Sequence, residues 1–241
     1  MRHKKGIITA IHGPMFSGKT EELLRQIRRA RIAGKTVQLF KPVKDNRYHA
    51  EKIVPHSMAS KSGREGFGET AIAVDSSYTI MQKINPSVNL VAIEEAQFFD
   101  EHLIDAVRIL SDRGIDVVMS LLDQDYRRRP FPISENLSSG DIIASSHLST
   151  KLSAICVQCG SDAQHSQKLT LTGEYPTGEP IYVPASFQGD TVEVGTGREL
   201  NFRKKHPPFI YEARCLDCHE VPDMPVLQIQ DYRMQNKETT G

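Results

Sequence analysis

A glycine-rich octapeptide near the N-terminus carries the residue types that bind phosphate. Residues 13–20 read Gly-Pro-Met-Phe-Ser-Gly-Lys-Thr and follow the apolar segment 7–11. In such a G-x-x-x-x-G-K-[ST] loop, backbone N–H groups surround phosphate oxygens, the lysine reaches the β- and γ-phosphates, and the last hydroxyl binds Mg²⁺. The sequence therefore predicts a nucleoside triphosphate site, with a chance glycine-rich turn as the alternative. The predicted binding residues are Gly13, Pro14, Met15, Phe16, Ser17, Gly18, Lys19 and Thr20.

Two adjacent carboxylates follow another apolar run. Glu94 and Glu95 come directly after residues 88–93, which predict a buried strand. A phosphate loop needs an acidic residue at the end of a neighbouring strand to hold Mg²⁺, and Glu94 fits that role. Glu95 can then accept or orient the hydroxyl that attacks the γ-phosphate. The alternative is that both glutamates only end a strand in solvent.

The chain contains four cysteines, arranged as two C-x-x-C pairs: Cys156 with Cys159, and Cys215 with Cys218. In a reducing compartment this arrangement predicts a tetrahedral zinc site. We interpret it as structural, because four thiolates leave no open position for catalysis. Two disulfides or one redox pair are the alternatives, and two disulfides would require an oxidising compartment. His219, next to the last cysteine, could substitute as a ligand.

The composition is that of an ordinary globular protein without a polyanion-binding charge. The chain has 241 residues, of which 39% are hydrophobic, and 30 Lys and Arg balance 30 Asp and Glu. This balance argues against nucleic-acid and membrane partners. His12 and Gly13 interrupt the N-terminal apolar stretch before it reaches signal-peptide length, and no apolar run approaches the about 20 residues that span a bilayer. We therefore predict a cytoplasmic protein.

Strand and helix patterns alternate through the first half of the chain. A helix from residue 20 to Gly34, strands at 36–40, 88–93 and 117–122, and a helix capped by Asp100 predict a parallel sheet with helices on both faces. Ligands in such folds gather at the carboxyl ends of the strands. We expect a P-loop NTPase-like α/β domain at 1–150, a small zinc-binding domain at 151–220 and a tail at 221–241. Residues 44–69 predict a loop with little structure of its own.

Two functional classes fit these features. One is a small-molecule kinase, and the other is an ATP-driven machine that uses its zinc domain and the run Arg127-Arg128-Arg129 to contact nucleic acid. Such a run is more often a solvated or phosphate-facing loop, and the neutral net charge weakens the second class. A guanine-nucleotide switch is not indicated, because neither an Asn-Lys-x-Asp motif nor a D-x-x-G follows the phosphate loop.

Six motifs, in their order and spacing, resemble those of the type II thymidine kinases. They are the phosphate loop, Lys-Asp-Asn-Arg-Tyr at 44–48, Glu-Glu-Ala-Gln-Phe-Phe at 94–99, Leu-Asp followed by Tyr126 and Arg-Pro-Phe at 122–131, and the two cysteine pairs. The resemblance implies phosphorylation of the 5′-hydroxyl of thymidine by ATP, with Mg²⁺ and a structural zinc. It also implies a homotetramer and inhibition by dTTP.

By motif position, the resemblance implies that Glu95 is the catalytic base and that Glu94, usually aspartate in the family, lies with Thr20 on the Mg²⁺ side. It further places Asp45, Asn46, Arg47 and Gln97 among the residues around the nucleotide. The residues that it implies at the nucleoside are Met15, Phe98, Leu122, Tyr126, Phe131, Ser166, Val192, Glu193, Val194, Gly195 and Tyr211. By default the apolar members would be core residues.

The zinc-binding segment of the family covers the nucleoside as a lasso, and this chain departs from the family there. The lasso is longer between Cys159 and Val192 and between Gly195 and Tyr211. Ser166 stands where threonine is common, and the missing methyl loosens contact with the thymine 5-methyl by about 1 kcal/mol. We therefore expect deoxyuridine to be accepted as well.

Overall fold

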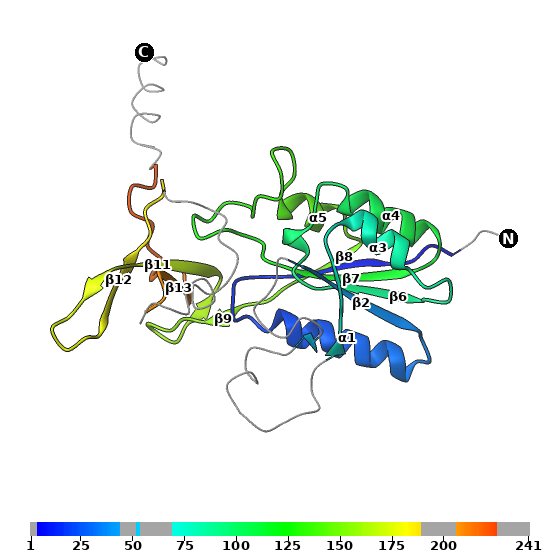
Figure 1. The fold of residues 1–241 in the computed structure, drawn as a ribbon, viewed down its shortest axis with the longest axis horizontal. Coiled ribbons are helices and arrows are strands. Elements are labelled where there is room, and N and C mark those ends of the chain that lie inside the picture. The colour runs from blue at the N-terminus through cyan, green and yellow to red at the C-terminus, as the bar shows by residue number, and fades with distance from the viewer. Residues whose placement is uncertain (1–3, 44–51, 54–68, 189–205, 226–241) are drawn as a thin grey trace, which may run out of the picture.

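The computed structural model describes residues 4–43, 52–53, 69–188 and 206–225 (Figure 1). Within these residues, six strands form one sheet in the order β5-β2-β6-β7-β1-β8, and all its neighbours are parallel. The strands are β1 (Ile8–His12), β2 (Val37–Pro42), β5 (Ile72–Val74), β6 (Leu90–Ile93), β7 (Asp116–Leu121) and β8 (Leu148–Lys151). The predicted parallel α/β architecture is thus confirmed.

Helices cover both faces of this sheet (Figure 1). They are α1 (Lys19–Ile32) on one face and α3 (Ser77–Lys83), α4 (Leu103–Asp112) and α5 (Ser139–Ser145) on the other. Successive residues of β1 point to opposite faces, so Ala10 packs in the core under α4 and Ile11 packs under α1. Because both faces are buried, the central strands contain continuous apolar runs rather than alternating ones.

Helix α1 follows directly from its apolar spacing. Leu23, Leu24 and Ile27 recur on one face, and all three are buried against the sheet. Acidic residues occupy its first turn and arginines its last turn, which complements the helix dipole. Gly34 follows the helix with a φ of 76°, a left-handed conformation that glycine adopts at little cost.

The predicted role of Asp100 as the cap of α4 is wrong. His102 occupies that position, and α4 begins at Leu103. The Asp100 carboxylate instead accepts hydrogen bonds from the backbone N–H of Ser77 at 2.7 Å and of His102 at 3.0 Å. It also accepts one from the Ser77 hydroxyl. Asp100 therefore joins the beginnings of α3 and α4, a link between distant segments that no local pattern predicts.

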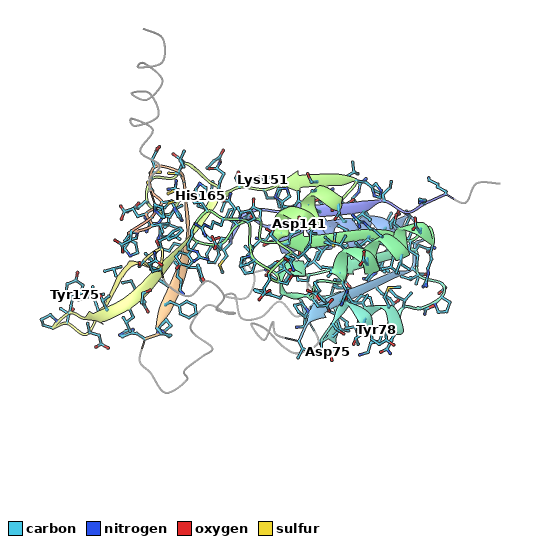
Figure 2. All side chains as sticks on the ribbon, turned by 90° about the horizontal axis from the view of Figure 1, so that it is seen from above. Asp75, Tyr78, Asp141, Lys151, His165 and Tyr175 are labelled. Atoms are coloured by element: carbon cyan, nitrogen blue, oxygen red, sulfur yellow. The ribbon has the colours of Figure 1, made fainter. Side chains whose placement is uncertain are left out.

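A second, smaller unit follows β8. It contains a three-stranded antiparallel sheet in the order β12-β11-β13 and a two-stranded pair, β9 with β10. These strands are β9 (Ala154–Ile155), β10 (Asp162–Ala163), β11 (His165–Glu174), β12 (Pro180–Pro184) and β13 (Phe209–Arg214). The unit lies beside the carboxyl ends of the main sheet (Figure 1). Figure 2 shows Lys151 and His165 on either side of the junction.

Residues 44–69, predicted to be a loop, are described only in part. Two short strands, β3 (Lys52–Ile53) and β4 (Glu69–Thr70), pair in antiparallel fashion. Asp45, Asn46 and Arg47 lie outside the described residues, as do Val192, Glu193, Val194 and Gly195. None of the helices in the described ranges combines the length and the apolar character needed to cross a membrane.

Candidate active site and metal centre

The phosphate loop connects β1 to α1 at the carboxyl edge of the main sheet. Gly13 has a φ of 146° and Gly18 a φ of 81°, values that side chains disfavour. A Cβ at Gly13 would also lie 2.3 Å from the carbonyl oxygen of Leu152. Only glycine therefore fits where the loop passes the chain that leaves β8. Phe16 is left-handed too, with a φ of 66°, a strain typical of functional loops.

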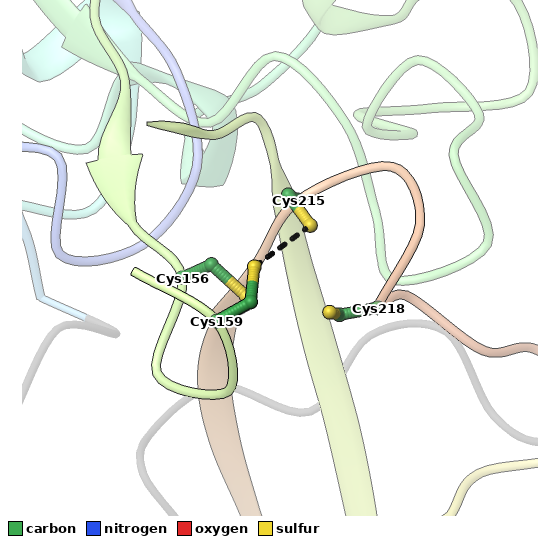
Figure 3. Close-up of side chains that lie close together, drawn as sticks. All are labelled: Cys156, Cys159, Cys215 and Cys218. Atoms are coloured by element: carbon green, nitrogen blue, oxygen red, sulfur yellow. Dashed lines mark hydrogen bonds between the residues drawn. The ribbon is translucent and has the colours of Figure 1, made fainter. Parts of the chain in front are cut away.

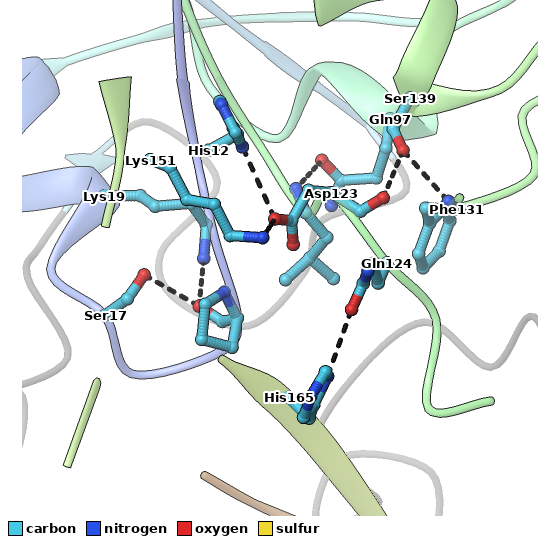
Figure 4. A network of polar contacts seen from close by, with 12 residues as sticks. His12, Ser17, Lys19, Gln97, Asp123, Gln124, Phe131, Ser139, Lys151 and His165 are labelled. Carbon is cyan, nitrogen blue, oxygen red and sulfur yellow. Dashed lines mark hydrogen bonds and ion pairs between the residues drawn. The ribbon is translucent and has the colours of Figure 1, made fainter. Parts of the chain in front are cut away.

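Lys19 lies over the backbone of its own loop. Its ammonium donates to the carbonyl oxygen of Pro14 at 2.6 Å, and the Ser17 hydroxyl donates to the same oxygen at 2.8 Å (Figure 4). Lys19 is buried. The cation is thus held within the loop, where a bound triphosphate would need a positive charge beside its β- and γ-phosphates.

Glu94 is held between the phosphate loop and the central strand β7. Thr20 Oγ1 donates to Glu94 Oε1 at 2.6 Å, and Ser120 Oγ donates to Glu94 Oε2 at 2.6 Å. Glu94 is only 4% exposed, so both contacts are sheltered from water. A hydroxyl and a carboxylate side by side are the hard oxygen donors that Mg²⁺ prefers, and these residues therefore fit that ion.

Glu95 follows Glu94 but turns to different partners. Its φ of 50° and ψ of 49° place it in the left-handed region, which is uncommon for a residue other than glycine. The Glu95 carboxylate accepts a hydrogen bond from the side-chain amide of Gln97. Gln97 Oε1 in turn accepts from the backbone N–H of Leu122 at 3.1 Å. This chain of contacts fixes the partly buried Glu95 beside the end of β7.

Several residues predicted at the nucleoside lie in contact with the phosphate loop or close to Glu95 along the chain. The Met15 N–H in the phosphate loop donates to Ser166 Oγ on β11 at 2.9 Å. The rings of Phe98 and Phe131 meet edge to face, with centroids 5.7 Å apart. Phe98 belongs to the 3-10 turn η1 (Ala96–Phe98), directly after Glu95. The geometry thus brings the phosphate loop, the second unit and an aromatic pair to one edge of the sheet.

Tyr126 lies against the second unit, and Tyr211 belongs to that unit on β13. Tyr126 is 2% exposed, and its hydroxyl donates to the carbonyl oxygen of Ser186 at 2.8 Å. The Lys168 ammonium lies 5.5 Å from the Tyr126 ring centroid and 5.0 Å from that of Phe209. Phe209 in turn contacts Tyr211 edge to face. The ammonium of the buried Lys168 therefore lies near the rings of Tyr126 and Phe209, and its backbone pairs with Tyr211 in the register of β11 with β13.

A polar cluster at the strand ends was not predicted as part of the site. Asp123 Oδ2 lies 3.4 Å from His12 Nδ1 at the end of β1 and 3.0 Å from Lys151 Nζ at the end of β8 (Figure 4). Burial opposes ionisation of Asp123, but His12 and Lys151 lower its pKa below its ordinary value. The position at the carboxyl ends of parallel strands, which singles out Asp123 in the sequence, is the signal that could also have identified His12 and Lys151.

The four cysteines form a cluster that fits a zinc ion. All four sulfur atoms lie within 4.8 Å of one another, and Cys159 Sγ is 3.6 Å from Cys215 Sγ (Figure 3). A tetrahedron of sulfurs around zinc needs separations of about 3.8 Å. The cysteines are free thiols, which does not support the disulfide alternative. His219 stands outside this cluster, because its Nδ1 accepts from Arg128 Nε at 3.1 Å.

The thiol chemistry also favours a bound cation. Burial opposes ionisation of Cys156, but backbone N–H groups of Cys215, Cys159 and Gln158 lower the pKa of this thiol to about 6. Hydrogen bonds with the sulfurs of Cys215 and Cys159 raise the pKa of Cys218 to about 12. Crowded sulfurs therefore resist joint ionisation, and a divalent ion is what would allow four thiolates to coexist.

Comparison with known proteins matches most of the chain to one family. A family model described as "Thymidine kinase" matches residues 6–189, a span that includes the phosphate loop, both glutamates and the first cysteine pair. Among solved structures, the X-ray structure of the Legionella pneumophila ATPase DotB is 14% identical, with a TM-score of 0.34. The alignment covers 76% of this chain and 45% of that chain. A likeness this weak carries no argument about function.

Proposed function

Because the chain belongs to the thymidine kinase family, we propose that it transfers the γ-phosphate of ATP to the 5′-hydroxyl of thymidine and produces dTMP. The observation that carries this proposal is the divergence of two neighbouring carboxylates. Glu94 binds Thr20 of the phosphate loop, whereas Glu95, turned by its left-handed backbone, lies with Gln97 next to Phe98. One acid thus serves the donor and the other is available to the acceptor.

On the donor side, the chain supplies a cradle for the triphosphate. Backbone N–H groups of residues 13–20 and the Lys19 ammonium bind phosphate oxygens, and Thr20 and Glu94 hold Mg²⁺. The ion, when bound, neutralises charge that develops on the transferred phosphoryl group. Asp45, Asn46, Arg47 and Gln97 complete the donor site in this proposal, although the side chain of Gln97 contacts Glu95 and the backbone N–H of Leu122.

On the acceptor side, Glu95 orients the 5′-hydroxyl and accepts its proton as the phosphorus–oxygen bond forms. Phosphoryl transfer depends mainly on such positioning, because little covalent chemistry is left to the protein. The base enters a flat apolar slot to which Phe98, Phe131 and Tyr126 contribute. Deoxyuridine is accepted too, because Ser166 lacks the methyl that a threonine would place against the base.

The wider proposals follow from the family resemblance. Zinc in the cysteine cluster stabilises the lasso, and the enzyme acts as a cytoplasmic homotetramer in nucleotide salvage for DNA synthesis. The triphosphate of the product nucleoside, dTTP, inhibits it, because the base of that compound fits the acceptor slot while its phosphates occupy the phosphate loop. Titration of the initial rate with dTTP tests this last point.

The direct test of the proposed function is transfer of labelled γ-phosphate from ATP across a panel of nucleosides. We expect rapid labelling of thymidine, slower labelling of deoxyuridine, and little transfer to purine nucleosides. Single-stranded and duplex DNA, added without nucleoside, serve as controls for an ATPase that depends on nucleic acid. Stimulation of ATP hydrolysis by DNA, without transfer to any nucleoside, would contradict the proposal.

A further inference from the structure

The three consecutive arginines of residues 127–129 turn toward the second unit. Asp125 shapes the turn that presents them, because its Oδ1 accepts from the backbone N–H of Arg127 at 2.8 Å and of Arg129 at 3.1 Å. The guanidinium carbons of Arg127 and Arg129 lie 5.4 Å and 4.6 Å from the ring centroid of Phe187. Phe187 is buried, and both cations lie within cation–π distance of this aromatic ring of the second unit.

Arg128 contacts a different residue of that unit, His219. Its Nε donates to Nδ1 of His219 at 3.1 Å, and its Nη2 donates to the carbonyl oxygen of His219 at 3.0 Å. His219 directly follows Cys218 of the four-cysteine cluster and is 4% exposed. Gln167 on β11 binds Glu220, the residue that follows His219. Its side-chain amide donates to the carbonyl oxygen of Glu220 and accepts from the N–H of Glu220, both at 2.8 Å.

The backbone of Arg128 carries strain that these contacts must maintain. Its φ of 62° lies in the left-handed region, which an arginine adopts only when its surroundings hold it there. A solvated loop could relax from this conformation. Backbone hydrogen bonds between Asp125 and residues 128 and 129 close the turn, and the paired hydrogen bonds to His219 hold the Arg128 side chain against the second unit.

We propose that residues 126–129, here called the arginine clamp, position Tyr126 for the nucleoside by tying it to the four-cysteine centre. This inference rests on the proposed function. Tyr126 is held at its hydroxyl by Ser186, and the next residues hold Phe187 and His219. The arginines are thus positioning residues. Loss of the clamp would loosen the base slot and the metal centre together, while the phosphate loop stays intact.

The test compares the wild type with Arg128→Gly. Glycine accepts the left-handed backbone without strain, so this variant removes the side chain and its guanidinium contacts without straining the turn. Arg128→Lys keeps the charge but loses the forked hydrogen bonds. The control is Arg108→Ala, which removes an exposed arginine of α4 whose nearest carboxylate oxygen is 3.9 Å away. The measurements are the rate of zinc release to a chromogenic chelator and the KM values for thymidine and ATP.

We expect Arg128→Gly to release zinc roughly tenfold faster and to raise the thymidine KM roughly tenfold, with the ATP KM and kcat within about twofold of wild type. Arg128→Lys should fall between, and Arg108→Ala should match the wild type. Zinc release and thymidine KM both unchanged in Arg128→Gly would overturn the clamp. A wild type that phosphorylates no nucleoside would overturn the proposed function instead, and the zinc-release rates would still decide the clamp.

Discussion

At the scale of single residues, backbone conformation gives two adjacent acids different tasks. Glu94 and Glu95 carry the same side chain, and both directly follow β6. Glu94 is buried with Thr20 and Ser120, whereas the left-handed Glu95 contacts Gln97 and remains partly exposed. The sequence motif predicted the pair, but the turn between them depends on tertiary contacts that no local pattern encodes.

Ser166 on β11 connects the second unit to the phosphate loop through the N–H of Met15. Ser166→Ala removes the acceptor of the Met15 N–H, and we expect a loss of about 1 kcal/mol in unfolding free energy together with a higher thymidine KM. Ser166→Thr keeps the hydroxyl and adds a methyl, which should raise the preference for thymidine over deoxyuridine by roughly threefold or more. Urea unfolding and kcat/KM for both nucleosides measure these effects. An unchanged Ser166→Ala enzyme would exclude this role.

At the scale of elements, the ends of neighbouring strands build the site. The parallel sheet and α1 could be predicted, because their apolar patterns are long and their glycine signals are clear. Helices α3 and α5 could not, since seven residues give too few turns for a periodicity. The predicted cap of α4 was also wrong. The Asp100 carboxylate accepts a hydrogen bond from the backbone N–H of Ser77 at the beginning of α3, a contact between distant segments.

Asp123 joins the ends of β1 and β8 and offers a test by pH. Asp123→Asn should lose about 1–3 kcal/mol in unfolding free energy near neutral pH, because the negative carboxylate that contacts Lys151 and His12 is replaced by a neutral amide. The pKa of Asp123 is lowered in the folded state, so its contribution is present above about pH 4 and is lost as the pH falls through the folded pKa. The difference between wild type and variant should therefore shrink below about pH 4.

Denaturant unfolding from neutral pH down to the acid limit of the fold measures that difference. Asp112→Asn is the matched control, because Asp112 forms an exposed ion pair with Lys5 at 2.6 Å, and such pairs contribute at most about 1 kcal/mol. A pH-independent difference for Asp123→Asn would show that the carboxylate charge is not what stabilises the strand ends.

At the scale of the whole molecule, the small second unit depends on its contacts with the larger unit built on the main sheet. The main sheet has its own apolar core, whereas the buried cluster around the cysteines consists of Cys156, Cys215 and three alanines. A metal is one of the means by which so small a core is stabilised. Sequence spacing predicted this centre, but the inward turn of residues 127–129 could not be predicted, since a run of arginines reads as solvated.

Replacement of one cysteine tests whether the second unit depends on its metal while ATP binding by the phosphate loop does not. Cys156→Ser should reduce bound zinc to a small fraction, lower the melting temperature, and raise the thymidine KM at least tenfold, because one missing thiolate weakens the metal site. ATP binding by the phosphate loop should remain within about threefold. Val157→Ser, a change of the exposed neighbour in the same loop, is the control. Metal analysis that finds no zinc in the intact wild type would contradict this account.

The most direct test of the central claim is the turnover of Glu95→Gln with thymidine and ATP. The amide keeps the size of the side chain but cannot accept the proton of the 5′-hydroxyl. We predict a fall in kcat of at least about 10²-fold, with the dissociation constants of thymidine and ATP within about threefold of wild type. Glu101→Gln, at an exposed site, should retain full activity. A Glu95→Gln enzyme with kcat near wild type would contradict the account.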